Sequence, residues 1–462
     1  MKNVVVENCY VHDVNFFWDE DKHDPDNPPD TLEGLAEICP SFTASGSLGR
    51  RYYRNYGGIV FSNATTVQIG ASWYENLYAI NNVIERVART GIYVTTRWNN
   101  APGVGYGENK FVDETERWND AEKGIGYFIH KNVNFVDNKL DLIAGDGIIL
   151  GAKDSVLQGN ICYRANYLGC RKELSITGVE AAQYFNAAIW VYDANNVLFQ
   201  NNEAGYTFLR NGGGDGEGFD IDNSCENVYF QYNYAHHNEG GGILVCNTTV
   251  ELLRHDKDGN VISPYGNAES LLGVWRNNYI RNNLFVFNGS KTDGNRSAFL
   301  TVARECKDLY VYNNTVIFEH ATKTSGSGIT RVVPRSVITC EDIKASTGQQ
   351  YFNNVFWLAQ NSAVEPTLVS NNNLKDAIYK NNLYFNTGNL HNLFATPDDS
   401  AILNIDPQIT IPTEFDGLDK IALFKGANSQ LFQGGLVVDG MLEKDILGKK
   451  VGNIKYVGAF AG

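Results

Sequence analysis

Short apolar segments of one pattern recur along most of the chain. Each has β-branched or aromatic residues followed by an asparagine, as in KNVVVENCYVHDV, INNVIERVARTGIYV, DSVLQGNICYRA, NNVLFQNNEAGY, ENVYFQYNYAHHN, RNNLFVFN and DLYVYNNTVIF. A second apolar pattern precedes the later copies: GDGIILGAK, NAAIWVYDA, GEGFDIDNS, GGGILVCNT and AFLTVARE. Equivalent glycines at 218 and 242 are 24 residues apart, and equivalent valines at 197 and 228 are 31 apart. These intervals are short for strand–helix–strand units but suit coils of short strands and turns.

Stacked coils of short parallel strands account for this repeat, because each coil buries one face and contacts only its neighbours. An asparagine at a fixed place in each turn tolerates left-handed backbone and can hydrogen-bond the same residue in the next coil. We therefore predict an all-β fold, a right-handed parallel β-helix, with the handedness taken from the family resemblance described below. The alternative is a β-propeller, which needs antiparallel blades joined by hairpin turns, and few Asn-Gly or Asp-Gly hairpins are found here.

Segments that interrupt the period are predicted to be loops that wall a groove on one side of the solenoid. We predict a β-helix over 1–393 and a C-terminal capping segment over 394–462, because an open solenoid end exposes strand edges and apolar core. The predicted insertions lie near 16–57, 97–130, 164–186, 247–276 and 319–335.

Two parts of the chain carry a family resemblance. The tail, with IDPQI, ALFKGANSQLFQGG, DILG and IKYVGAFAG, resembles the ending of many secreted bacterial β-helix proteins of the pectate-lyase-like superfamily. The block from WVYDANNVLFQNNEA to GDGEGFDIDNSCENVYFQYNYAHHNEGGGILVC is similar to β-helix polysaccharide-degrading proteins of gut bacteria. The resemblance covers about 60–462 and implies a right-handed β-helix in a carbohydrate-active protein that is secreted, periplasmic or on the cell surface. It does not choose an activity, because this fold hosts hydrolases, lyases and binding proteins.

Strand alternation predicts which residues of the second pattern share an outer face. Aligning the copies places apolar residues at the inward positions, namely Ile148, Leu150, Ile189, Val191, Phe219, Ile221, Ile243 and Val245. The intervening residues then point outward, namely Ile149, Gly151, Trp190, Tyr192, Asp220, Asp222, Leu244 and Cys246. Because neighbouring coils are about 4.8 Å apart, we expect Trp190 and Tyr192 to lie beside Asp220 and Asp222.

An aromatic platform beside paired carboxylates is what a sugar site needs, because sugar ring faces stack on aromatic rings while carboxylates bind hydroxyls or carry protons. We interpret the pair as the acid and the nucleophile or base of a glycoside hydrolase that cleaves a complex glycan, in unassigned order. Retaining hydrolysis needs carboxyl groups about 5–5.5 Å apart and inversion about 6.5–9.5 Å, and the strand spacing allows either. The alternative is a solvated polar face. The Asn-x-Asp, Asp-Asp, Gly-His-Gly and Arg-x-Lys motifs of polygalacturonases are not intact in this sequence.

Further polar candidates flank these strands. Acids just before each strand line the adjacent edge, and of the adjacent histidines only one, His237, is expected to reach the groove. Basic residues near the strand ends could bind an acidic sugar, serve as a lyase base or form salt bridges. We expect a supporting catalytic role for Glu217 and His237, and substrate contacts from Asp146, Lys153, Asp193, Asp215, Glu239 and Arg304.

Two other functions remain open. A polysaccharide lyase would abstract the proton next to a uronate carboxylate with Lys or Arg as base, and a non-catalytic protein would only bind glycan. The alternating oxygen ligands of DGEGFD could bind Ca²⁺, although the helix–loop–helix calcium pattern is absent. No other cofactor is expected, since the motifs for zinc and nucleotides are missing and the eight cysteines form no CxxC pair.

The net charge of the chain argues against some classes of binding partner. The net charge of −15 and a pI of about 5.0 argue against nucleic acid or an anionic membrane as the partner. No apolar run is long enough to span a bilayer. The N-terminus lacks a signal-peptide pattern and already has the pattern of a strand, so we expect that upstream residues have been removed.

Overall fold

The structure of the protein is a computed structural model. It describes residues 1–14, 57–62, 73–87, 89–94, 130–167, 172–174, 180–182, 186–209, 215–222, 225–247, 254–255, 261–262, 275–290, 297–304, 306–324, 330–333, 336–341, 346–359, 376–388, 390, 397–403, 405–428, 434–452 and 455–461.

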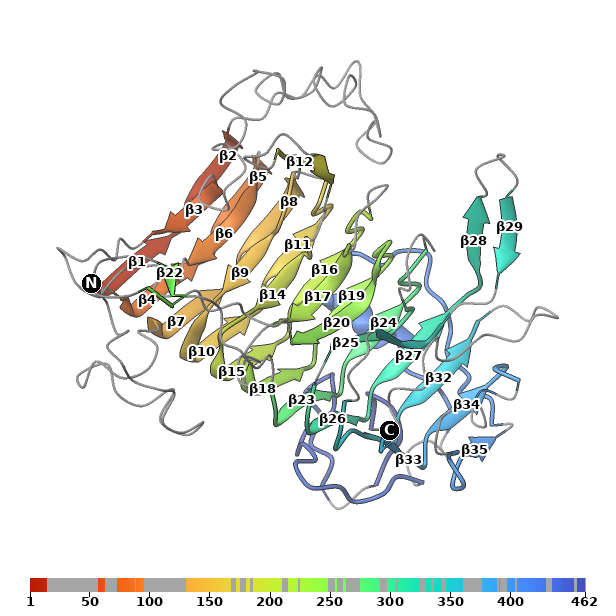
Figure 1. The fold of residues 1–462 in the computed structure, drawn as a ribbon. Coiled ribbons are helices and arrows are strands. Elements are labelled where there is room, and N and C mark those ends of the chain that lie inside the picture. The colour runs from red at the N-terminus through yellow and green to blue at the C-terminus, as the bar shows by residue number, and fades with distance from the viewer. Residues whose placement is uncertain are drawn as a thin grey trace.

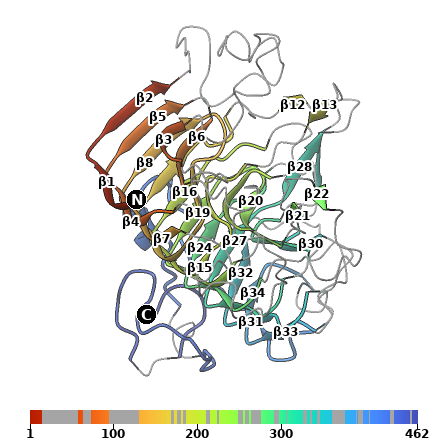
Figure 2. The same ribbon diagram turned by 60° about the vertical axis from the view of Figure 1, so that its left-hand side comes forward.

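Three long sheets, named A, B and C, run side by side along the molecule (Figures 1 and 2). Sheet A consists of β1 (Lys2–Glu7), β4 (Glu75–Ile80), β7 (His130–Val136), β10 (Ala152–Gln158), β15 (Asn195–Gln200), β18 (Glu226–Gln231), β23 (Asn278–Arg281), β26 (Leu309–Tyr312), β31 (Gln350–Phe352) and β33 (Ile378–Lys380).

The other two sheets have the same stacked order. Sheet B consists of β2 (Tyr10–Val14), β5 (Val83–Val87), β8 (Lys139–Ile143), β11 (Ile161–Tyr163), β16 (Glu203–Gly205), β19 (Tyr234–His236), β24 (Leu284–Val286), β27 (Thr315–Phe318), β32 (Val355–Leu358), β34 (Leu383–Phe385) and β35 (Ile402–Leu403). Sheet C consists of β3 (Gly57–Phe61), β6 (Thr90–Val94), β9 (Ile148–Leu150), β14 (Ile189–Val191), β17 (Glu217–Ile221), β20 (Gly241–Asn247), β25 (Leu300–Arg304) and β30 (Ile338–Glu341).

All neighbouring strands of these three sheets are parallel, and from β1 to β32 the chain visits the sheets in the repeating order A, B, C. The described strands after β32 belong to sheets A and B. This arrangement confirms the predicted all-β parallel β-helix and is consistent with the right-handed sense that parallel crossovers adopt. A propeller is contradicted, because its blades are antiparallel.

Antiparallel pairs are found within three of the predicted insertions. They are β12 (Lys172–Leu174) with β13 (Glu180–Ala182), β21 (Arg254–His255) with β22 (Val261–Ile262), and β28 (Ala321–Thr324) with β29 (Thr330–Val333). In chain order each pair adjoins a strand of sheet C. The predicted insertions near 16–57 and 97–130 lie almost wholly outside the described residues.

The sequence predicts one asparagine per turn that is left-handed and also hydrogen-bonds to the next coil. In the turns from sheet A to sheet B, two adjacent residues have these two properties separately. The first is left-handed, as at Asn81 and Asn201, each with φ of 52°. The second points inward and forms a ladder in which each side-chain amide donates to the next coil at 2.8–3.2 Å. The ladder comprises Asn82, Asn138, Asn160, Asn202, Asn233, Asn283, Asn314, Asn354 and Asn382, and Asp398 ends it by accepting from Asn382. It satisfies buried amides that would otherwise be costly.

The core confirms the predicted register of sheet C. The strand partners are Ile148, Ile189, Phe219 and Ile243 in one inward column, and the column two residues on is equally apolar. All eight predicted inward residues are fully buried and belong to the main core. Period-two alternation therefore placed this sheet correctly.

The C-terminal segment lies along the outer face of sheet B. Its 3₁₀ helix, η6 (Leu418–Phe424), brings Ile421 and Phe424 against an apolar group from the later sheet B strands. That group contains Tyr234, Leu284, Val286, Ile317, Val355, Trp357 and Leu383. β35 pairs in parallel with β34 beyond the predicted boundary at 393. The segment thus covers one side of the solenoid in addition to following its end.

Candidate functional site

The outer face of sheet C brings aromatic and acidic residues into adjacent coils. Trp190 on β14 is the strand partner of Asp220 on β17, as predicted. The same outward column continues from Tyr93 and Ile149 on one side to Leu244 on the other. The sheet therefore presents an aromatic region followed directly by an acidic strand.

The aromatic region is held together by ring contacts. The rings of Trp190 and Tyr192 are 5.4 Å apart between centroids, and the hydroxyls of Tyr93 and Tyr192 are 3.3 Å apart. Val60, Ile149 and Ala187 pack around them. Trp190 is only 4% exposed, whereas Tyr192 is half-buried. Tyr192 is therefore the more accessible of the two predicted platform residues.

A buried ion pair fixes the position of Trp190. The Arg89 guanidinium lies 2.8 Å from the Asp146 carboxylate, and both side chains are at most 1% exposed. The Trp190 indole N–H donates to Asp146 Oδ1 at 3.1 Å, and Arg89 also donates to Asn186 at 3.0 Å. Gly145 leaves the space for Arg89, because a Cβ there would overlap the guanidinium.

This geometry changes the interpretation of Asp146. The sequence predicts a substrate contact at the groove edge, but the Asp146 carboxylate is fully buried against Arg89 and Trp190. A charge in that position stabilises the fold only while its partner is present. We therefore assign Asp146 as a positioning residue for Trp190. The sequence does not predict a role for Arg89, because this residue follows β5 and belongs to no recognisable motif.

The acids of the next strand lie close together. Asp220 is 5% exposed, Glu217 is fully buried and Asp222 is half-buried. Burial raises the pKa of the Cys225 thiol, and the negative charges of Asp222, Asp193 and Asp220 raise it further. Burial also raises the pKa of Cys306, again with contributions from Asp220 and Asp222. Asp193, Asp220 and Asp222 therefore all lie near enough to Cys225 to act on its thiol.

The remaining predicted residues lie around or away from these acids. Asp215 is half-buried just before β17, and Glu239 accepts a hydrogen bond from the Leu209 backbone N–H at 2.7 Å. Arg304 ends β25, where its backbone pairs with Asn247. Lys153 lies on β10 of sheet A beside Lys131, and burial together with that neighbouring charge lowers its pKa. Lys153 is thus on a different sheet from the paired acids.

His237 corrects the sequence prediction most clearly. It follows β19 with φ of 52°, so the chain turns there and its ring lies over the outer face of sheet B, not in a sheet C groove. Its ring centroid is 4.5 Å from that of Phe415 and 5.4 Å from that of Tyr206. Burial and the nearby His236 lower the pKa of His237 to about 4. A left-handed residue at the strand end is what alternation could not anticipate.

Metal ligation has no support from the part of the chain that the structure describes. Within it, no group of three or more His, Cys, Asp or Glu side chains is arranged to hold a metal ion. Calcium binding by the segment around Asp215 and Glu217 therefore stays a prediction. Among the described residues no helix is long and apolar enough to cross a bilayer.

Comparison with known proteins gives similarity to solved structures alone. No family model matches the chain, and no curated protein matches it. A structure of XylC with xylose is 12% identical with a TM-score of 0.41, over 85% of this chain and 60% of that one. Pectate lyase Pel9A is 11% identical with a TM-score of 0.39, over 99% and 97%. A GH136 lacto-N-biosidase from Eubacterium ramulus is 17% identical with a TM-score of 0.28, over 58% and 44%.

The chain therefore spans 60% of the XylC structure and 44% of the lacto-N-biosidase structure that it matches, in both cases less than two thirds. At these identities and TM-scores, the fold assignment rests on the three parallel sheets of this chain.

Proposed function

We propose that the protein is a carbohydrate-active enzyme, a glycoside hydrolase whose site is the outer face of sheet C. The observation that carries this proposal is the strand pairing of Trp190 with Asp220. Trp190 itself is buried, so the ring that can stack on a sugar is the half-buried Tyr192 of the same strand end, while a carboxylate in the next coil reaches the sugar's hydroxyls or its glycosidic oxygen. The family resemblance of the central block supports the same class of activity, and with it a secreted, periplasmic or cell-surface location.

In the proposed reaction one of Asp220 and Asp222 protonates the leaving glycosidic oxygen as the bond from the anomeric carbon breaks. The other removes a proton from the attacking water, or first forms a glycosyl ester that water then hydrolyses. Residues two apart on one strand are separated by about 6.6 Å, so both stereochemical outcomes stay open. Tyr192 would contact the sugar, and Glu217 and Asp193 would keep the site acidic.

The acidic surroundings favour neutral glycans over uronate polymers. Asp193, Asp220 and Asp222 act together on one buried thiol, so their charges would repel a uronate carboxylate. A lyase would also need a base near the reacting carbon. Of the two basic candidates, Lys153 lies on sheet A, and Arg304 ends β25, two strands away from β17 in sheet C.

The test is a screen of neutral oligosaccharides and polysaccharides for new reducing ends. We expect Asp220→Asn and Asp222→Asn each to reduce turnover by about 10²–10⁴-fold while substrate binding persists. Asp419→Asn is the matched control, because that side chain is 80% exposed on η6.

Three results would contradict the proposal. Full turnover by both site variants would remove the paired acids from the mechanism. Absorbance near 235 nm from a uronate polymer would indicate a lyase. Binding of glycans by the wild-type protein without any turnover would indicate a binding protein.

A further inference from the structure

The outer face of sheet B changes character along the solenoid. In the late coils its outward residues are apolar and lie under the C-terminal segment. In the early coils the corresponding strand partners are polar: His12, Glu85, Asp141 and Tyr163. Asp416 and Gly417 of the C-terminal segment lie beside this polar stretch.

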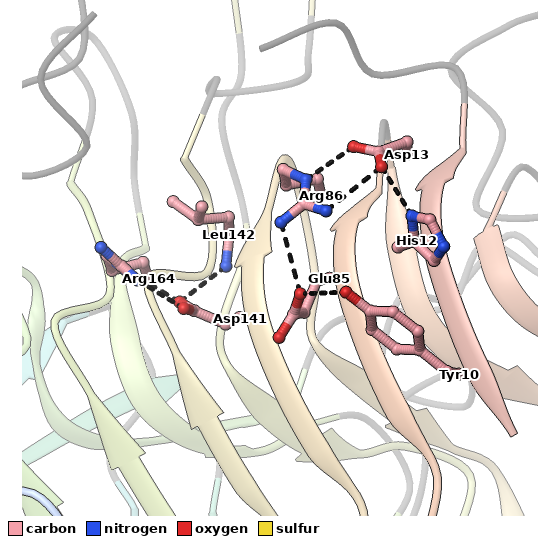
Figure 3. A network of polar contacts seen from close by, with 8 residues as sticks. All are labelled: Tyr10, His12, Asp13, Glu85, Arg86, Asp141, Leu142 and Arg164. Carbon is pink, nitrogen blue, oxygen red and sulfur yellow. Dashed lines mark hydrogen bonds and ion pairs between the residues drawn. The ribbon is translucent and has the colours of Figure 1, made fainter. Parts of the chain in front are cut away.

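Two arginines hold the carboxylates of this polar stretch in place (Figure 3). Arg164 pairs with Asp141, which also accepts from the Leu142 backbone N–H at 2.8 Å. Arg86 lies 3.3 Å from Glu85, and the Tyr10 hydroxyl donates to Glu85 at 2.8 Å. Both arginines have left-handed backbone, Arg164 directly after β11 with φ of 49° and Arg86 one residue before the end of β5 with φ of 51°. Glu85 and Asp141 therefore have fixed orientations without being buried.

Between these carboxylates and the C-terminal segment there is a cavity of about 320 Å³. Its base is apolar, formed in part by the partly buried Val83 and Ile161. Its polar lining groups come from Glu85, Lys139, Asp141, Tyr163 and Asp416. The volume is at the lower end of the roughly 300–1,000 Å³ range of small-molecule sites.

A buried carboxylate stands directly behind this cavity. Glu203 is the strand partner of Ile161 and is fully buried. Its Oε1 accepts from the Tyr163 hydroxyl at 2.5 Å and from the Gly417 backbone N–H at 2.8 Å, both of which belong to lining residues. Its Oε2 accepts no hydrogen bond from the described residues. Tyr163 remains a proton donor, because burial and the Glu203 charge raise its pKa strongly.

Glu203 is also tied to the adjacent coil. His236 Nε2 lies 3.1 Å from Glu203 Oε1, and Gly205 makes room for that ring because a Cβ there would lie 2.6 Å from it. The cavity is thus backed by a hydrogen-bonded group of Tyr163, Glu203 and His236. Such support gives a binding site its fixed shape.

We propose that this cavity is a second ligand site that takes one neutral sugar ring, separate from the sheet C site. Carboxylates only accept hydrogen bonds, so the ligand must offer several donors, as a ring of hydroxyls does. With the neighbouring Asp13 and the buried Glu203 included, the carboxylates around the cavity still outnumber Lys139, Arg86 and Arg164, which disfavours an anionic sugar. Val83 and Ile161 can meet the apolar face of the ring. The inference does not depend on the proposed hydrolase activity.

Binding to the full chain tests this site. We would titrate methyl β-glucoside, methyl β-galactoside, N-acetylglucosamine and glucuronate, with calorimetry and ligand-observed NMR as readouts. We expect at least one neutral ring to bind and glucuronate to bind at least about tenfold more weakly. Val83→Phe fills the cavity and should weaken binding at least tenfold. Val5→Phe is the control, because Val5 is 53% exposed on sheet A.

A second variant keeps the test independent of folding. Tyr163→Phe retains the ring and removes the hydroxyl, and should weaken binding about three- to tenfold. If Val83→Phe does not fold, this variant carries the prediction. The site is rejected if no neutral ring binds, if glucuronate binds best, or if binding survives both changes. If Asp220→Asn alone abolished binding, the sugar ring would bind on sheet C and the second site would be rejected. Failure of the hydrolase proposal would appear separately, as absent turnover.

Discussion

The outer faces of sheets B and C obey the same alternation but carry different outward residues. On sheet C, the outward residues are aromatic and acidic. Each antiparallel pair of the insertions comes directly before or after a sheet C strand in the sequence. On sheet B, the C-terminal segment covers the later coils and leaves a polar cavity beside the earlier ones. The inward columns are apolar on both sheets, so the two faces differ in their outward columns.

The connections explain why the two faces diverge. The turns from sheet A to sheet B carry the asparagine ladder and have a left-handed residue in a fixed place, which leaves no room for insertions at that corner. The connections on either side of sheet C carry all the predicted insertions. Loops that can vary in length are where solenoids build binding surfaces.

The largest expected effect concerns the buried pair behind the sheet C site. Arg89→Ala leaves Asp146 charged and fully buried, so we expect the free energy of unfolding to fall by about 3–5 kcal/mol. Urea denaturation would measure this loss. The double variant Arg89→Met with Asp146→Leu should recover most of it, because two apolar side chains then replace the two charges.

A loss below about 1 kcal/mol in Arg89→Ala would contradict this assignment and return Asp146 to the list of substrate contacts. The hydrogen bond from Trp190 gives a second readout. If the Arg89–Asp146 pair positions the Trp190 indole, the near-ultraviolet circular dichroism of the protein should change in Arg89→Ala and in the double variant.

The cover on sheet B gives the next largest effect. Phe424 is fully buried against Tyr234 and Phe415, with ring centroids 5.9 Å away in each case. Phe424→Ala should therefore cost about 3 kcal/mol of unfolding free energy. Leu423→Ala is the matched control in the same helix, because Leu423 is 50% exposed and should change stability by less than about 0.5 kcal/mol. Equal, small effects would mean that the segment is not part of the fold.

How far the sequence could predict these faces depended on the range of the interactions. The register of sheet C was predictable, because alternation along Phe219 to Ile221 repeats in the neighbouring copies. The placement of His237 was not, because a single left-handed residue redirected the chain. Arg89 and Asp146 meet across coils with no shared motif. The packing of Phe424 on sheet B likewise depends on contacts between distant segments.

The pH dependence of stability tests the burial of His237 on the outer face of sheet B. The pKa of His237 is lowered to about 4 by burial and by His236, with Asp416 acting in the opposite sense. The unfolded chain, with an ordinary histidine pKa near 6.5, binds more protons between these values. Stability is therefore fully present above pH 6.5 and is lost as the pH falls toward 4.

At pH 5 this loss amounts to about 2 kcal/mol relative to neutral pH. Thermal unfolding from pH 7.5 to 4.5 should show the decline in the wild-type protein and a shallower decline in His237→Phe. Identical slopes in the two proteins would show that His237 is not held in its neutral form by the aromatic residues of sheet B.

The smallest expected effect is at the open end of sheet B. Arg86 contacts Asp13 at 2.6 Å, but these side chains are 24% and 45% exposed, so water screens the pair. Arg86→Ala should change the free energy of unfolding by less than about 1 kcal/mol, and the change should shrink further in high salt. A large loss would mean that the polar stretch of sheet B, shown in Figure 3, is needed for folding. A small loss would mean that the carboxylates of the polar stretch are not needed for folding and are available for ligand binding. The apolar residues under the C-terminal segment, by contrast, are needed for stability.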